Sequence, residues 1–382
     1  MTGAPAAWLR AQVARQLFLH VVKRMGPALE GLRLRRPASF FHRVGADGLI
    51  GFGESYVAGD WDADDLVGVL TALAGEVDRL VPAPLQKLRR TVLPRTPRAV
   101  RGTPDGARHN IARHYDLSNE LFAAFLDESM TYSAAWFADP AAATWADLAP
   151  AQRRKIDRLL TQARVGPGTR LLEIGSGWGE LAVRAARRGA EVVSITLSGE
   201  QVRLAKERAR AARLAAPPEF RLCDYREVDG SFDAIVSAEM IEAVGARHWP
   251  EYFAVLQRRL APGGRIALQA ITMPHDRMLA TLGTHTWVQK HIFPGGMLPS
   301  VPAIESLLGP LRIVQRLSLR EHYAHTLRLW RERFTRQRDH ITDLGFDETF
   351  HRMWRFYLAY SEAGFRSGYL DVWQLTMERR RS

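Results

Sequence analysis

The sequence has one cysteine, Cys223, among 382 residues. A single cysteine excludes an intramolecular disulfide and any metal site built from several thiolates. No H-E-x-x-H or paired-histidine spacing for a metal is present, and no apolar run reaches the roughly 18 residues that a membrane-spanning helix needs. The first residues, MTGAPAAWLR, also lack the charged start and continuous apolar core of a signal peptide. We therefore expect a cytoplasmic protein without a metal site.

Acidic residues are fewer than basic residues in this sequence. The chain has 53 Lys and Arg against 41 Asp and Glu, which gives a net charge of +12 at pH 7. This balance favours a polyanionic partner, either nucleic acid or an anionic phospholipid surface, although a solvated basic surface would have the same composition. Because 46% of the residues are hydrophobic and 25% charged, we expect a globular chain, and its length is typical of about two domains.

The central feature of the sequence is residues 170–197, RLLEIGSGWGELAVRAARRGAEVVSITL. An apolar run, a turn with Gly175, Gly177 and Gly179, a segment of helical period and a second apolar run predict a strand, turn, helix and strand. Glycines let a ligand approach the backbone and permit unusual backbone angles. The spacing is neither the G-x-G-x-x-G of dinucleotide folds nor a phosphate loop, so it disfavours a pyrophosphate ligand.

Alternating strand and helix patterns predict an α/β fold with a doubly wound, mostly parallel sheet. Residues 273–308 interrupt the alternation, and we expect substrate-contacting insertions there. Pro262–Gly264 predicts a turn before a strand. The predicted strands are 170–174, 191–196, 219–223, 232–237, 264–270, 311–319 and 370–377. The predicted helices are 178–188, 199–213, 248–260, about 323–341 and about 347–363.

The sequence pattern of the N-terminal residues predicts a separate structural unit. Residues 1–85 are expected to form a small α+β accessory domain, residues 86–110 a basic linker rich in Pro and Arg, and residues 111–382 the main domain. Within residues 7–25 a helical face is predicted, flanked by Arg and Lys. This pattern fits either a basic helix at a membrane interface or an ordinary amphipathic helix packed on its own domain. The predicted face consists of Trp8, Leu9, Val13, Leu17, Phe18, Val21, Val22 and Met25.

Several ordered segments sharpen the functional interpretation. The segments are HYDLSNELFAAFLDESMTYSAAWF (114–137), EIGSGWG (173–179), TLSGEQ (196–201), DYRE (224–227), EMIEAVG (239–245) and YLAYSEAGFRSG (357–368). In this order they resemble the cyclopropane-fatty-acyl-phospholipid synthase family, and GFGESYVAGDWDADDL (51–66) resembles the front domain of its full-length bacterial members. The resemblance implies a class I methyltransferase fold and S-adenosylmethionine-dependent transfer to the cis double bond of an unsaturated phospholipid acyl chain.

The resemblance also implies which residues bind S-adenosylmethionine. A Tyr-Ser pair would contact the methionine part, and the glycine turn would supply backbone amides to its carboxylate. Thr, Ser and Gln would take the ribose position, where an acidic residue is usual in this fold class, and a segment after the third strand would form the adenine wall. The predicted residues are Tyr132, Ser133, Glu173, Gly175, Gly177, Gly179, Thr196, Ser198, Gln201, Asp224, Tyr225 and Arg226.

In the family that the sequence resembles, a bound bicarbonate is the base that removes a proton after methyl transfer. The residues that would hold it are matched by Glu242, Ile271 and Tyr323, whereas Ala134 replaces a Cys and Gln269 a His. An amide still donates a hydrogen bond to an anion, so we expect bicarbonate binding to be weakened without being excluded. The predicted catalytic residues are Glu242, Tyr323, Gln269 and Ile271.

Three functions remain open at this point. The favoured one is a lipid-modifying enzyme, either a cyclopropane synthase or, because Ala134 and Gln269 depart from the family, a C-methyltransferase that acts on acyl chains and gives methyl- or methylene-branched products. The alternatives are an RNA methyltransferase, which the charge permits although no RNA-binding module is recognisable, and a non-catalytic lipid-binding relative. We expect an unsaturated phospholipid as partner, transient contact with the inner face of the membrane and no nucleic acid. A homodimer is left open.

Overall fold

A seven-stranded sheet forms the centre of the computed structural model, which describes residues 4–76 and 118–380. Its strands are β3 (Arg170–Ile174), β4 (Glu191–Thr196), β5 (Glu219–Leu222), β6 (Phe232–Ala238), β7 (Leu260–Thr272), β8 (Leu311–Ser318) and β9 (Asp371–Arg379). The spatial order is β5-β4-β3-β6-β7-β9-β8. The first five pair in parallel, and β9 runs antiparallel to β7 and β8. The predicted doubly wound, mostly parallel sheet is confirmed.

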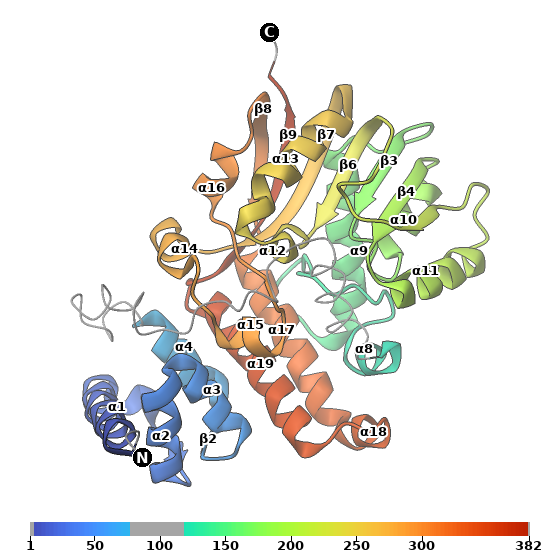
Figure 1. Cartoon of the computed structure of the whole chain (residues 1–382). Coiled ribbons are helices and arrows are strands. Elements are labelled where there is room, and N and C mark those ends of the chain that lie inside the picture. Colours follow the sequence, from blue (N-terminus) through green and yellow to red (C-terminus); the bar gives the residue numbers. More distant parts are fainter. Residues whose placement is uncertain (1–3, 77–117, 381–382) are drawn as a thin grey trace.

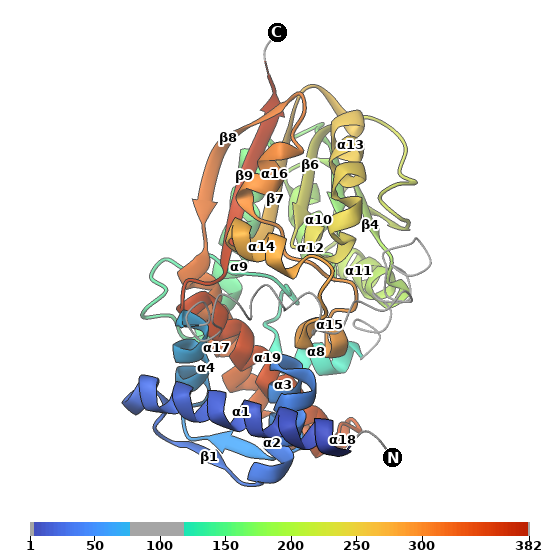
Figure 2. The same cartoon turned by 60° about the vertical axis from the view of Figure 1, so that its left-hand side comes forward.

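Helices cover both faces of this sheet, as Figures 1 and 2 show. Those around the sheet are α9 (Trp145–Gln162), α10 (Glu180–Arg187), α11 (Gly199–Ala211), α12 (Ile241–Val244), η3 (Ala246–His248), α13 (Trp249–Arg259) and α16 (Val301–Ser306). Leu171 and Val236 pack with α9, α10 and α11 on one face, whereas Leu172 and Ile235 pack with α13 and α16 on the other. Successive strand residues point to opposite faces, so the apolar run in β3 supplies two cores.

The front of the chain forms a small α+β unit, as predicted. Its elements are α1 (Ala4–Met25), η1 (Gly26–Leu29), β1 (Leu32–Leu34), α2 (Pro37–Asp47), α3 (Leu49–Val57), β2 (Trp61–Ala63) and α4 (Leu66–Gly75), with β1 and β2 antiparallel. The predicted basic linker, residues 86–110, lies outside the described residues. The domain boundaries therefore remain a prediction.

The helix predicted over residues 7–25 is present, but its eight apolar residues do not form one packed face. Phe18 meets the rings of Phe40 and Phe41 on α2, with centroids 5.1 and 5.8 Å away. Val21, Val22 and Met25 pack against the same core. The remaining four, Trp8, Leu9, Val13 and Leu17, are exposed to solvent. Helical period alone did not show which apolar residues α2 would cover.

Three C-terminal helices connect the front unit to the sheet: α17 (Arg320–Arg336), α18 (Arg338–Asp343) and α19 (Glu348–Arg366). In Figure 1, α19 lies between the front unit and the sheet. Arg352 on α19 donates from Nε to the carbonyl of Tyr56 over 2.9 Å and lies 4.3 Å from the Tyr56 ring centroid. Its guanidinium also pairs with Asp62 at 3.3 Å. These contacts seat α3 and β2 against α19.

Residues 273–308 contain short helices: α14 (His275–Thr281), α15 (Trp287–His291) and α16. In α15, Trp287 packs so closely on α3 that a Cβ at Gly53 would lie 2.5 Å from its ring. The predicted turn at Pro262–Gly264 is wrong, because these residues form an irregularity inside β7, where pairing with β6 shifts register between Phe232 and Ala234. No helix within residues 4–76 and 118–380 combines the length and apolar character that crossing a bilayer requires.

Candidate active site

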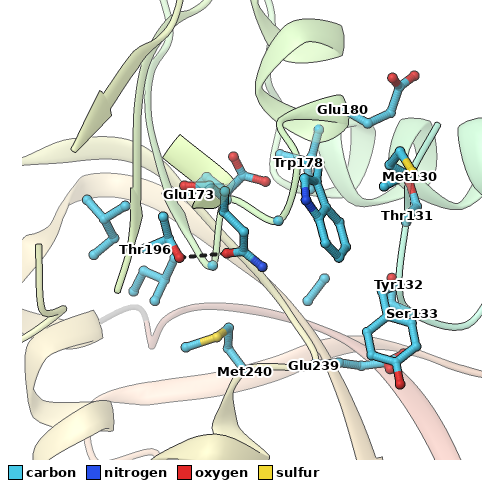
Figure 3. A pocket seen from close by; sticks show the side chains of 18 of the residues that line it. Met130, Thr131, Tyr132, Ser133, Glu173, Trp178, Glu180, Thr196, Glu239 and Met240 are labelled. Carbon is cyan, nitrogen blue, oxygen red and sulfur yellow. Dashed lines mark hydrogen bonds between the residues drawn. The ribbon is translucent and has the colours of Figure 1, made fainter. Parts of the chain in front are cut away.

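A pocket lies at the carboxyl ends of β3, β4, β5 and β6, the edge where open α/β sheets bind ligands. Figure 3 shows Glu173 and Thr196 on one side of it and Trp178, Tyr132 and Ser133 on the other. Eight of the twelve predicted cofactor residues line the pocket: Tyr132, Ser133, Glu173, Gly175, Gly177, Thr196, Gln201 and Tyr225. The fold thus brings together residues from four separate stretches of the sequence.

The glycine turn needs glycine for two reasons. Gly175, Gly177 and Gly179 have φ angles of +96°, +49° and +90°, a region that side chains disfavour. A Cβ at Gly175 would also lie 2.3 Å from Cγ of Met240, and one at Gly179 would lie 2.9 Å from Cβ of Ala205. Gly179 does not line the pocket; it precedes α10 and lets that helix approach α11.

The end of β4 carries hydroxyl and amide groups in place of an acid. Thr196 donates its hydroxyl to Oε1 of Gln201 over 2.7 Å, which leaves the NH2 group of Gln201 as a donor for a ligand. Ser198 does not line the pocket. Its Oγ accepts a hydrogen bond from the backbone N–H of Gln201 at 3.2 Å and caps α11. Ser198 therefore positions Gln201.

Of the three predicted residues after β5, one lines the pocket and the other two form an ion pair with each other. Tyr225 lines the pocket and packs edge to face on Tyr252, with centroids 5.2 Å apart. Asp224 is buried and accepts two hydrogen bonds from the Arg226 guanidinium, at 2.8 and 2.7 Å. Neither Asp224 nor Arg226 is in the lining, so Tyr225 alone of the three residues predicted for the adenine wall borders the pocket.

Titratable groups meet under the glycine turn. Burial raises the pKa of Glu173 to about 8, against the opposing effects of the Ser194 hydrogen bond and the positive charge of Lys155. Burial also lowers the pKa of Lys155 to about 8, against the negative charges of Glu239, Asp127 and Glu173. Lys155 donates to Oγ of Ser133 over 2.5 Å and so connects α9 with the Tyr-Ser pair. The sequence analysis did not identify Lys155.

Aromatic side chains close the other side of the pocket. Tyr132 and Trp178 line it, and Trp178 is held by α8 (Asn119–Phe125) through a 2.7 Å hydrogen bond to Oδ1 of Asn119. The Tyr132 hydroxyl lies 2.8 Å from that of Tyr357 on α19, and its ring lies 5.3 Å from the Trp330 ring on α17. We call Tyr132, Trp178, Trp330 and Tyr357 the aromatic wall.

A family model described as mycolic acid cyclopropane synthetase matches residues 103–375, well over half of the chain. The chain belongs to this family. The predicted likeness to cyclopropane-fatty-acyl-phospholipid synthases is thereby confirmed. The protein is an S-adenosylmethionine-dependent methyltransferase, and S-adenosylmethionine is its cofactor.

Individual relatives extend over nearly the whole chain. Tuberculostearic acid methyltransferase UfaA1 of Mycobacterium tuberculosis is 59% identical over 99% of this chain and 92% of its own. Cyclopropane-fatty-acyl-phospholipid synthase of Escherichia coli is 33% identical over 94% of this chain and 92% of its own. Among solved structures, mycolic acid cyclopropane synthase CmaA1 complexed with SAH and CTAB is 31% identical, covers 71% of this chain and 98% of its own, and has a TM-score of 0.65.

The pocket fits this cofactor chemically. The carboxylates of Glu173 and Glu239 line it, and burial raises the pKa of each. A ligand that brings a sulfonium and an ammonium group would offset the cost of burying these negative charges. Tyr132 and Trp178 add aromatic faces, which attract cations. Within the described residues, no group of His, Cys, Asp and Glu is arranged to bind a metal ion.

The predicted catalytic residues lie behind the pocket wall, around a residue that the sequence analysis missed. Glu239, after β6, lines the pocket and accepts a 2.7 Å hydrogen bond from Nε2 of Gln269 and a 2.8 Å bond from the hydroxyl of Tyr323. Glu239 lies inside the quoted segment EMIEAVG, but no spacing rule links it to β7 or α17. Only the tertiary fold brings these three side chains together.

Glu242, three residues after Glu239, makes a separate hydrogen bond to β7. Its Oε1 accepts a hydrogen bond from the backbone N–H of Ile271, and its Oε2 is buried without a hydrogen-bond partner among the described residues. Burial, reinforced by the negative charge of Glu239, raises the pKa of Glu242 to about 8. The structure thus brings Glu242 and Ile271 together, and Gln269 and Tyr323 together around Glu239.

The glycine turn gives the first prediction. Gly175→Ala should weaken binding of S-adenosylmethionine by about tenfold or more, because a side chain at a positive φ costs ~1–2 kcal/mol and its Cβ would push Met240 into the pocket. Isothermal titration calorimetry measures the affinity. Gly166→Ala is the matched control, because its Cβ would meet no atom within 4 Å and should leave binding unchanged. Equal affinities of the two variants would contradict this account of the turn.

Proposed function

We propose that the protein methylates a double-bond carbon in the acyl chain of an unsaturated phospholipid and forms a branched chain. The observation that supports the proposal is that Tyr132 and Trp178 of the aromatic wall line the same pocket as the glycine turn. An alkene is a weak nucleophile, and its attack leaves a carbocation. Such chemistry needs a dry site with aromatic or negative groups close to the positive charge.

Branching is favoured over ring formation by two observations. The relative that is 59% identical is named a methyltransferase, whereas the cyclopropane synthase of E. coli is 33% identical. Ala134 and Gln269 also stand where the cyclopropane synthases that the sequence resembles are expected to hold bicarbonate with Cys and His. Loss of the proton after a hydride shift would give a methylene branch, whereas direct closure would give a ring. Cyclopropane formation remains the alternative product.

Each part of the site has a proposed role. S-adenosylmethionine supplies an electrophilic methyl group. The backbone amides of the glycine turn hold its carboxylate, and Gln201 binds the ribose. The aromatic wall excludes water and faces the developing positive charge. The backbone N–H of Ile271, near the end of β7, donates a hydrogen bond to Glu242. We assign this pair a positioning role, in which it keeps the end of β7 and the neighbouring Gln269 in place.

The second prediction concerns the product. Expression in a bacterium whose phospholipids contain cis-unsaturated chains should increase the mass of those chains by one CH2 unit. Fragmentation should place a branch, and no ring, at the former double bond. Lipid mass spectrometry with nuclear magnetic resonance of the isolated fatty acids distinguishes the two isomers. Detection of a cyclopropane ring would replace the proposed product by its alternative, and an unchanged lipid profile from folded, cofactor-binding protein would contradict the proposal.

We also propose that α1 brings the protein to the membrane that contains the substrate. Leu9, Val13 and Leu17 recur every four residues, so they form one stripe on the helix, and they are 59%, 52% and 41% exposed. Trp8 is 65% exposed. The helix contains no Asp or Glu, whereas Lys23 and Arg24 lie in its last turn. An apolar stripe with basic neighbours matches an anionic phospholipid surface.

The third prediction tests this surface. The double variant Leu9→Ser, Leu17→Ser should bind vesicles of unsaturated phosphatidylglycerol about 100-fold more weakly or worse, because each leucine contributes roughly 1.5–3 kcal/mol when buried in lipid. Co-sedimentation with the vesicles measures binding. Leu222→Ser is the control, since this residue is 63% exposed at the end of β5 and should not alter binding. If all three proteins bind equally, α1 is not the membrane contact.

A further inference from the structure

The Glu239 carboxylate is surrounded by hydrogen-bond donors. Its Oε1 accepts from the backbone N–H of Ala134 at 2.8 Å and from Nε2 of Gln269 at 2.7 Å. Its Oε2 accepts from the hydroxyl of Tyr323 at 2.8 Å. Positions 134, 269 and 323 are three of those at which the sequence analysis expected contacts to bicarbonate. In this protein the donors at these positions hold a carboxylate of the protein itself.

A chain of hydrogen-bonded side chains determines which end of the Gln269 amide faces Glu239. Arg158 donates to Oε1 of Gln374 over 2.6 Å, so the NH2 group of Gln374 is the end that faces Gln269. Gln374 in turn donates to Oε1 of Gln269 over 2.9 Å. The NH2 group of Gln269 must therefore point to Glu239, where it can only donate. Gln269 and Gln374 are both buried, so this polarity persists in a site without competing water.

The backbone of Glu239 is strained. Its φ angle is +54°, a conformation that residues other than glycine rarely adopt. Such strain is found most often at functional sites, where the surrounding structure holds the residue in place. The strained backbone places the carboxylate on the pocket, and Figure 3 shows Glu239 near Tyr132 and Ser133.

Electrostatics keep this carboxylate ready to take up a proton. Burial raises the pKa of Glu239, while the positive charge of Lys155 and the three hydrogen bonds lower it. The net result is a raised pKa, so the carboxylate is a stronger base than an exposed glutamate. Oε1 accepts two of the hydrogen bonds and Oε2 one. Oε2 therefore has the freer lone pair for a proton.

We propose that Glu239 is the base that removes the proton after methyl transfer, as a built-in replacement for an exchangeable anion. This inference rests on the proposed function. The π electrons of the double bond form the new carbon–carbon bond, the carbon–sulfur bond breaks with its electron pair remaining on sulfur, and a cation is left on the lipid. A C–H bond next to the cation then gives its electron pair to the lipid and its proton to Oε2 of Glu239, which releases it to solvent.

The test compares wild type with Glu239→Gln and Glu239→Gly in buffer freed of bicarbonate. Wild type should form product at the same rate with or without added bicarbonate. With S-adenosylmethionine at saturating concentration, Glu239→Gln should lose activity by about 100-fold or more, as removal of a general base does. Glu251→Gln, at a half-exposed glutamate on α13 outside the pocket, is the control and should behave as wild type.

Glu239→Gly provides a second readout that does not depend on turnover. Glycine suits the positive φ, so this variant should fold, and it leaves the three donors around an empty space. Bicarbonate or formate should raise its melting temperature and restore part of its activity. Neither anion should change the melting temperature of wild type.

Three results would overturn the inference: loss of wild-type activity on removal of bicarbonate, wild-type turnover by Glu239→Gln, or stabilisation of wild type and Glu239→Gly alike by bicarbonate. Failure of the proposed function itself would look different. Wild type would then bind the cofactor and form no product from unsaturated phospholipid under any condition, whereas the melting temperatures would still report whether Glu239 fills the anion site.

Discussion

The burial of negative charge beside the glycine turn is the constraint on which the rest of the structure depends. Glu173 at the end of β3 and Glu239 after β6 bring carboxylates into one pocket, and Lys155 alone among the described lining residues brings a buried ammonium group. Carboxylates are costly to desolvate unless a cation or hydrogen-bond donors meet them. The protein supplies donors to Glu239, and a sulfonium cofactor supplies positive charge. The pocket is thus built for a cationic ligand before any substrate arrives.

The same constraint bears on the proposed base, Glu239. Its hydrogen-bond donors come from the loop at Ala134, from Gln269 on β7 and from Tyr323 on α17. Placing the base on the protein fixes its location relative to the methyl donor. On this account the product depends on which C–H bond lies closest to Oε2 of Glu239.

The sequence predicted the parts of this structure that depend on local pattern. The strand, glycine turn and helix over 170–188 and the parallel order of the sheet follow from periodicity and from glycine chemistry, and eight predicted cofactor residues share one pocket. Glu239 could not be found in this way, because its partners lie 30 and 84 residues further along the sequence. The division of α1 into packed and exposed residues depends on α2, and the irregularity in β7 depends on pairing with β6.

The most direct test of this account is a crystal structure of the protein with S-adenosylhomocysteine and an unsaturated phospholipid, grown in the presence of bicarbonate. The account predicts the sulfur atom next to the glycine turn, the double bond against the aromatic wall and the Glu239 carboxylate still held by Ala134, Gln269 and Tyr323. A bicarbonate ion among these three donors with Glu239 displaced, or a cofactor bound away from Gly175, would contradict it.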